Sequence, residues 1–107
     1  MPPRSAPLPI DVEAIGDDLV VVAVHVDIDL TEAGELRAVL NDACTGPHRS
    51  VVVDLDGVHF VGTSAMGVLA EVHQRMAEAD RRLIVLDAAD PVRSAFEMAG
   101  IAHLLEG

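Results

Sequence analysis

The chain has 107 residues, half of them apolar, and eighteen acidic against seven basic side chains give a net charge of -11. This length predicts one domain of ordinary size. The negative charge repels phosphate backbones and anionic lipid head groups, and two Phe with no Trp or Tyr offer little surface for stacking on bases. Direct binding to nucleic acid or to a membrane surface is therefore disfavoured.

Compartment and domain limits follow from the same sequence. The longest unbroken apolar run, residues 19–24, is far shorter than the roughly 20 residues that span a bilayer, so no membrane insertion is expected. Residues 1–9 contain four prolines and no apolar leader core, which predicts a flexible tail before a domain of residues 10–107. The lone Cys44 cannot form an internal disulfide and is expected to be buried. Together these features indicate a cytoplasmic protein.

The first half of the domain predicts a hairpin and then a helix. Residues 10–15 alternate apolar and acidic side chains, a G-D-D turn follows, and residues 19–28 are rich in Val, which indicates two antiparallel strands. Thr31 is the expected N-cap of a helix that Gly46-Pro47 ends. Its apolar face has the spacing of an amphipathic helix and consists of Leu36, Val39, Leu40 and Ala43.

The second half alternates strands and helices. Residues 51–55 and 83–86 are short apolar runs, the first typical of a strand covered on both faces. Asp90-Pro91 predicts a carboxylate cap with proline in the first turn of a helix that Gly100 ends, and residues 101–105 favour one more helical turn. The remaining predicted inward positions are Ala65, Val68, Leu69, Val72 and Met76 in one helix, and Val92, Ala95, Phe96 and Ala99 in the next. The predicted fold is α/β, a small mixed sheet of four to five strands flanked by about four helices.

Two adjacent hydroxyls, Thr63 and Ser64, stand where an apolar strand gives way to a helix. A nucleophilic serine at such a turn has the pattern G-x-S-x-G, and Asp87 or Asp90 followed by His103 would complete the chain order of a hydrolase triad. Met66 stands in place of the second glycine, and the predicted sheet is too small for that fold. An enzyme is therefore disfavoured.

Cofactor and metal sites find no support in the motifs. The chain has no phosphate-binding G-x-x-x-x-G-K-[ST] and no G-x-G-x-x-G after a strand. Its five histidines are scattered, with no pair at helical spacing, and it has one cysteine. Asp54 and Asp56 are best interpreted as solvated carboxylates at a strand end. No cofactor or metal is expected.

Two roles remain open for the hydroxyl of Thr63. As an N-cap it would stabilise the following helix by about 1 kcal/mol. As a phosphate acceptor it would gain about -1.5 to -2 charges at a corner that another protein can reach. The helix N-terminus tolerates that charge, whereas an apolar or acidic partner surface does not.

The same stretch resembles the STAS domains of bacterial anti-sigma factor antagonists. The family pattern is D-L-x-x-V-x-F followed by a D-S-S-G-L or D-S-T-G-L turn, and this chain has D-L-D-G-V-H-F-V and then G-T-S-A-M-G-V-L from position 54 onward. V-D-I-D-L at 26–30 stands where the family has G-E-L-D or G-E-I-D, and residues 90–101 resemble its third helix with a G-[IL] ending. Gly62 replaces the family's acidic residue, and Ala65 replaces a glycine.

The resemblance implies a domain that binds an anti-sigma factor of the serine/threonine kinase type and releases a sigma factor. Phosphorylation, implied at Thr63 with Ser64 as second candidate, would break the complex. The implied partner-binding residues are Asp27, Asp29, Leu30, Thr31, Gly62, Thr63, Ser64, Met66 and Gly67. A constitutive antagonist without phosphorylation, a scaffolding subunit of a lipid-transport ABC complex or stress-signalling assembly, and a weak homo-oligomer stay open.

Overall fold

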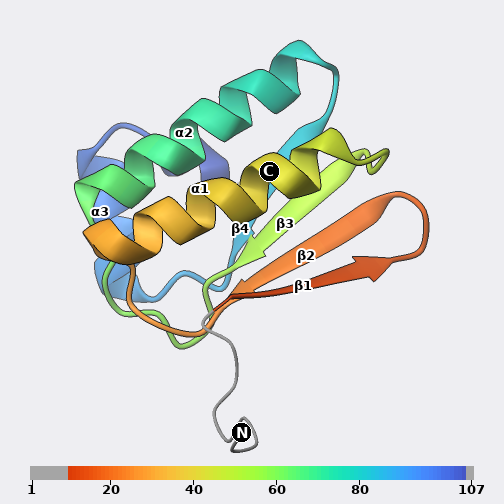
Figure 1. Cartoon of the computed structure of the whole chain (residues 1–107). Coiled ribbons are helices and arrows are strands. Elements are labelled where there is room, and N and C mark those ends of the chain that lie inside the picture. Colours follow the sequence, from red (N-terminus) through yellow and green to blue (C-terminus); the bar gives the residue numbers. More distant parts are fainter. Residues whose placement is uncertain (1–9, 106–107) are drawn as a thin grey trace, which may run out of the picture.

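The computed structural model describes residues 10–105, so the predicted tail of residues 1–9 and the last two residues of the predicted domain lie outside it. Four strands, three α-helices and one short 3₁₀ helix alternate along the described part of the chain (Figure 1). The elements are β1 (Ile10–Ile15), β2 (Leu19–Val24), α1 (Leu30–Thr45), β3 (Ser50–Asp54), α2 (Thr63–Glu78), β4 (Arg82–Leu86), α3 (Asp90–Met98) and η1 (Ala102–Leu105). The predicted α/β class and mixed sheet are confirmed.

The strands form one sheet in the order β1-β2-β3-β4, with β1 antiparallel to β2 and the other neighbours parallel. The predicted hairpin is confirmed, but β2 ends at Val24 rather than at residue 28. Ile28 makes only an isolated bridge to Val61. The chain leaves the sheet early because it has to turn into α1.

All of the main packing lies on one face of the sheet, on which α1 and α2 rest (Figure 1). Each strand from β2 onward adds to the same side of the sheet, so successive right-handed crossovers bring their helices to the same face. No helix within residues 10–105 covers the other face of β3, although Val52 on that face is only 8% exposed, so the expected burial of β3 on both faces is met without a second helix layer. The core unites the helices with the strand residues Val20, Val22, Val24, Val51, Val53, Leu83 and Val85.

The predicted helix faces are largely confirmed. Leu36, Leu40 and Ala43 of α1 are buried with Val39 partly so, and the five predicted positions of α2 are all buried. In α3 only Val92 and Phe96 are buried, whereas Ala99 is exposed because the helix already ends at Met98. The predicted extra turn is the 3₁₀ helix η1.

The predicted helix caps are wrong at three positions. Asp29, and not Thr31, caps α1, in a capping box in which the Asp29 and Glu32 side chains each accept a hydrogen bond from the other's backbone N–H. Gly62 occupies the N-cap of α2, and Ala89 that of α3, without a side-chain hydrogen bond at either. Asp90 is instead the first residue of its helix, where its charge still faces the positive end of the helix dipole.

Arg81 stabilises the other end of the helix layer. Its guanidinium donates hydrogen bonds to the backbone carbonyl oxygens of Cys44, Gly46 and His48, where α1 ends and the chain turns toward β3. A cation at this point complements the negative end of the α1 dipole. Cys44 is half-buried rather than buried, with its Sγ 3.3 Å from the Met76 Sδ. Burial raises the pKa of its thiol, although Arg81 and Arg75 act in the opposite direction.

Candidate functional site

Two loops meet at the carboxyl ends of β2 and β3. The backbone N–H of Ile28 donates to the Phe60 carbonyl at 2.9 Å, and the N–H of Gly62 donates back to the Ile28 carbonyl at 2.8 Å. The first loop leads into α1 and the second into α2. This corner of the molecule therefore brings together the two loops that the sequence predicted to form one binding face.

Asp27 is exposed, and its side chain links the two loops. Its Oδ1 accepts hydrogen bonds from the backbone N–H groups of His59 at 2.8 Å and Phe60 at 3.2 Å. The sequence predicted Asp27 as a partner-binding residue. In the structure its carboxylate already has two partners within the chain, which gives it a positioning role.

The start of α1 presents apolar surface beside this corner. Asp29 is occupied as the helix cap, with its Oδ1 2.8 Å from the Leu30 backbone N. Leu30 is 72% exposed, and Phe60 in the neighbouring loop is 51% exposed, so two large apolar side chains reach solvent at this corner. Thr31 is exposed on the first turn.

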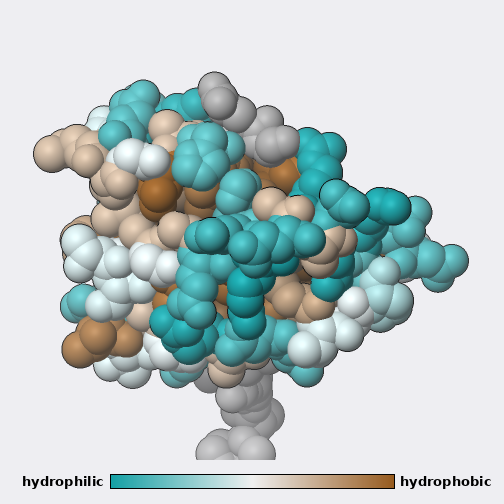
Figure 2. Space-filling view, turned by 90° about the horizontal axis from the view of Figure 1, so that it is seen from above, coloured by the Kyte–Doolittle hydropathy of each residue, from teal (hydrophilic) through white to brown (hydrophobic). Residues whose placement is uncertain are grey.

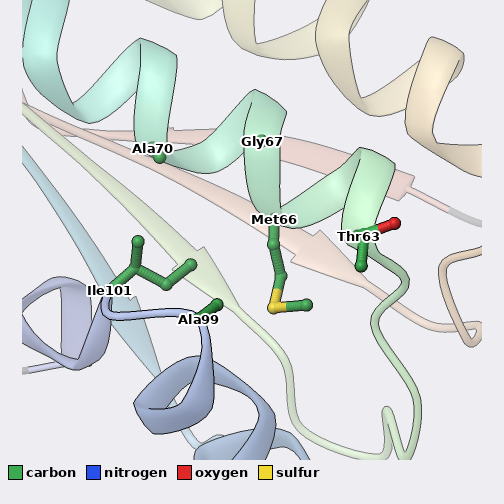
Figure 3. Close-up of a pocket in the computed structure, with 6 residues that line it drawn as sticks. All are labelled: Thr63, Met66, Gly67, Ala70, Ala99 and Ile101. Atoms are coloured by element: carbon green, nitrogen blue, oxygen red, sulfur yellow. The ribbon is translucent and has the colours of Figure 1, made fainter.

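Thr63 is the first residue of α2, and its hydroxyl has a different environment from the one a cap would have. The side chain is exposed, and it makes no hydrogen bond within residues 10–105. Its methyl group faces Met66, whereas the oxygen points away from Met66 and the other labelled residues (Figure 3). The predicted capping role is therefore wrong, because the N-cap position belongs to Gly62. The hydroxyl is left exposed at the positive end of the α2 dipole.

An apolar groove runs from Thr63 between α2 and the end of α3. One cavity of about 270 Å³ is lined by Thr63, Met66, Gly67, Ala70, Ala99 and Ile101 (Figure 3). A second, of about 310 Å³, shares Thr63, Met66 and Ala99 with it and extends to Ala95 and Met98. We call these residues together the α2–α3 groove. Met98 at its rim is 90% exposed.

Sequence reasoning assigned Met66 and Gly67 to the binding face but missed the wall that α3 contributes. Ala95 and Ala99 were predicted to face the core, and Met98 was not singled out. Its position off the inward face of an amphipathic helix was the available signal, because a large apolar side chain there has no core to enter.

Ser64 lies on the opposite side of α2 from this groove. It lines a separate cavity of about 230 Å³ between α1 and α2, together with Leu30, Ala33, Gly34, Arg37 and Val68. Ser64 is exposed and makes no hydrogen bond within residues 10–105. The two candidate acceptors therefore face different grooves.

The structure does not assemble the hydrolase triad. The His103 ring packs edge-on against the His73 ring, with centroids 5.0 Å apart, and within the described residues no hydrogen bond links it to Ser64, Asp87 or Asp90. Burial and the His103 charge lower the pKa of His73. Within the described residues, no three side chains of His, Cys, Asp or Glu come together as a metal site.

Carboxylates gather at the ends of β3 and β4, next to the corner. A side-chain hydrogen bond with Asp54 and the charges of Asp54 and Asp56 raise the pKa of Asp87. The Asp54 Oδ1 also accepts from the Asp56 backbone N at 3.0 Å. Asp87 and, as expected, Asp56 are solvent-exposed, whereas Asp54 is only partly exposed, and together they give the corner a negative field.

The polar and apolar surfaces are segregated in the view from above. Hydrophilic side chains cover its middle and right, and apolar ones gather toward the left, the end where α1 and α2 begin and α3 lies (Figures 1 and 2). A surface of this kind, apolar with a charged margin, is typical of a protein interaction site.

Comparison with known proteins agrees with this geometry. The family model described as STAS domain matches residues 9–106. The chain belongs to the STAS domain family. None of the helices within residues 10–105 is long and apolar enough to cross a membrane.

Relatives of this STAS domain include the anti-sigma-B factor antagonist of Staphylococcus aureus, 24% identical over 84 residues that cover 78% of each chain. The solved structure of the anti-sigma factor antagonist SpoIIAA in its unphosphorylated form is 18% identical with a TM-score of 0.78, and the match covers 89% of this chain and 84% of that one. An anti-sigma factor antagonist from Mycobacterium paratuberculosis is 21% identical with a TM-score of 0.79, over 88% and 79% of the two chains. SpoIIAA of Bacillus in its phosphorylated form has a TM-score of 0.72 and is 18% identical over 89% and 86%. The predicted STAS fold is thereby confirmed.

Proposed function

We propose that this STAS domain is a cytoplasmic, non-enzymatic anti-sigma factor antagonist. It binds an anti-sigma factor of the serine/threonine kinase type through the corner that joins the α1 and α2 starts, and it is switched by phosphorylation of Thr63. The observation that carries the proposal is the hydroxyl of Thr63, an exposed residue that lines an apolar groove and makes no side-chain hydrogen bond within residues 10–105. The names of the relatives support the class of partner.

The apolar elements of the corner supply affinity. Leu30, Phe60 and Met98 expose large apolar side chains around Thr63, and the α2–α3 groove offers a concave site for a partner side chain. Methionine adapts its shape to different neighbours, which suits a docking surface. The negative margin steers a partner that carries a basic patch.

Phosphorylation acts on this arrangement without unfolding it. A phosphate on Thr63 adds about -1.5 to -2 charges next to free N–H groups of α2, which stabilise it. The same charge next to the apolar groove has to lose its hydration when a partner docks, and it adds to the acidic margin. The bound state is therefore destabilised more than the fold.

Isothermal titration of the purified domain with its anti-sigma factor tests the switch. We expect Thr63→Glu to weaken the complex at least tenfold and Thr63→Ala to leave it within about twofold, because only the first adds charge. Gln74→Glu is the matched control, with the same added charge at an exposed position farther along α2, outside this corner. Equal weakening by both glutamate variants would contradict the assignment of the switch to Thr63.

Incubation with the anti-sigma kinase and ATP, followed by mass spectrometry, tests the modification itself. We expect one phosphate, which is lost in Thr63→Ala and retained in Ser64→Ala. Binding without any phosphorylation would identify a constitutive antagonist, and Gly62→Asp would then show whether the acidic residue of the family restores the reaction. Copurification with a transporter ATPase, and no binding to the kinase, would instead support the scaffolding role.

The groove has its own test. Met98→Lys should weaken the complex several-fold while the melting temperature stays unchanged, because the side chain is 90% exposed in the free domain. Glu97→Lys on the same helix makes a larger change of charge at an exposed position outside the groove and serves as the control. If both lysine variants bind alike, the groove does not contact the partner.

A further inference from the structure

The sheet has a second face on which none of the helices within residues 10–105 packs. Its side chains follow from the strand registers, which align three rows across the four strands. The first row holds Ile15, Leu19, Ser50 and Arg82, the second holds Glu13, Val21, Val52 and Ile84, and the third holds Asp11, Ala23, Asp54 and Leu86. We call these twelve residues the open sheet face.

The middle of the open sheet face is apolar. Val52 is only 8% exposed, yet it lies outside the core cluster that unites the helices with the other face. Val21 and Ile84 flank it and are partly exposed, and Ile15 and Leu86 expose 49% and 44%. Parallel strands are as a rule covered on both faces, so the apolar side chains of this face are expected to pack against another protein surface.

The corners of the face are arranged in complementary pairs. Ile15 and Leu86 stand at opposite ends of one diagonal, and Asp11 and Arg82 at opposite ends of the other. Four strands span about 14 Å and three rows of alternate residues about 13 Å, so the grid is nearly square. A two-fold rotation about a diagonal of this grid exchanges its rows with its columns and therefore lays one grid over another of the same size.

We propose that the open sheet face binds a second copy of this chain, with a two-fold axis along the diagonal from Ile15 to Leu86. This axis exchanges the other two corners, so Arg82 of each copy faces Asp11 of the other, twice in one interface, beside the His25 imidazole whose Nε2 lies 2.9 Å from the Asp11 Oδ2 within each copy. Ile15 and Leu86 meet their own counterparts, and the apolar middle is covered. Two sheets that cross at nearly right angles are a known packing mode, and a self-complementary patch is what a two-fold dimer requires.

The dimer is weak. The face measures roughly 14 by 13 Å between the outer backbones, which is small beside the about 800 Å² per partner of a standard stable interface. Each copy also carries a net charge of -11, so the copies repel at long range and moderate salt relieves that repulsion. We expect dissociation in the micromolar to millimolar range. The inference is independent of the proposed function, since the Thr63 corner adjoins the helix-covered face and stays free.

Sedimentation velocity of the full chain, from micromolar to millimolar concentration, tests the dimer and its axis together. We expect the wild type to pass from monomer to dimer. Asp11→Arg and Arg82→Asp should each be monomeric over the same range, because each places like charges at both corner contacts. A mixture of the two variants should form a dimer again, since both contacts then join Arg to Asp.

The controls make the same charge changes elsewhere on the surface. Asp42→Arg on α1 and Arg93→Asp on α3 should both still dimerise. Asp42→Arg lowers the negative net charge and should dimerise slightly more tightly than the wild type, whereas Arg93→Asp raises it and should dimerise slightly less tightly. Added salt should remove both differences. Circular dichroism melts verify that every variant is folded. A monomeric wild type at all concentrations overturns the proposal. The proposal is also overturned if Asp11→Arg and Arg82→Asp each still dimerise. A mixture of the two variants that stays monomeric, when each variant alone is monomeric, overturns it as well.

Discussion

Removing the Asp27 carboxylate should loosen the whole corner at which the loops meet. Its Oδ1 accepts two backbone hydrogen bonds, of 2.8 and 3.2 Å, from His59 and Phe60. Hydrogen bonds to a charged group contribute about 1.5–3 kcal/mol at best, and these are solvent-exposed, so we expect Asp27→Ala to lower the unfolding free energy by about 1–2 kcal/mol in total. For a domain of this size that is a fall of roughly 4–8 °C in the melting temperature. Asp27→Asn keeps a carbonyl oxygen as acceptor and should lose about half as much.

Thermal unfolding by circular dichroism measures the loss, and amide hydrogen exchange locates it. The N–H groups of His59 and Phe60 should exchange faster in Asp27→Ala, while those of the central strands follow only the global change. Asp56→Ala is the control, because it removes a nearby exposed carboxylate that accepts no hydrogen bond from this loop. If the two alanine variants have the same stability and the same exchange at these amides, Asp27 does not position the loop.

Three further predictions concern the fold around the site. Urea denaturation of Thr63→Ala should show a change in the unfolding free energy of less than about 0.5 kcal/mol. In the same assay Gly62→Asp should raise it by a few tenths of a kcal/mol, because the new carboxylate can cap α2. A loss of about 1 kcal/mol in Thr63→Ala would show that Thr63 caps the helix after all. Phe96→Ala should cost about 3–5 kcal/mol in the same assay, because Phe96 is fully buried and leaves a cavity; a loss below 1 kcal/mol would refute its place in the core. Asp87 has a folded-state pKa above its ordinary value of 3.8, chiefly through its hydrogen bond with Asp54. The stabilisation that protonated Asp87 gives the fold is therefore complete below pH 3.8, and it is lost as the pH rises through the folded-state pKa. The stability of the wild type relative to Asp87→Asn should fall over that interval, and a flat difference in pH-dependent melts would contradict the coupling.

The capping errors have one physical cause. Local sequence offers several hydroxyl and carboxyl side chains near a helix start, and each could satisfy the first free N–H groups. Which of them does so depends on where the chain leaves the preceding strand. The bridge between Ile28 and Val61 fixes that point for both loops, which leaves Gly62 at the N-cap of α2 and frees the Thr63 hydroxyl.

The sequence by itself determined the class of fold, the hairpin, the buried faces of α1 and α2, and the pair of hydroxyls at the start of α2. These depend on periodicity and on residues near one another in the chain, and they hold in any α/β arrangement with this pattern. The tertiary structure alone decided that the Asp27 carboxylate accepts backbone hydrogen bonds from the neighbouring loop, that α3 closes an apolar groove beside Thr63, and that no helix within residues 10–105 packs on one face of the sheet. Each of these features depends on the direction in which successive crossovers place their helices. They involve contacts between residues far apart in the chain, and no local sequence pattern predicts such contacts.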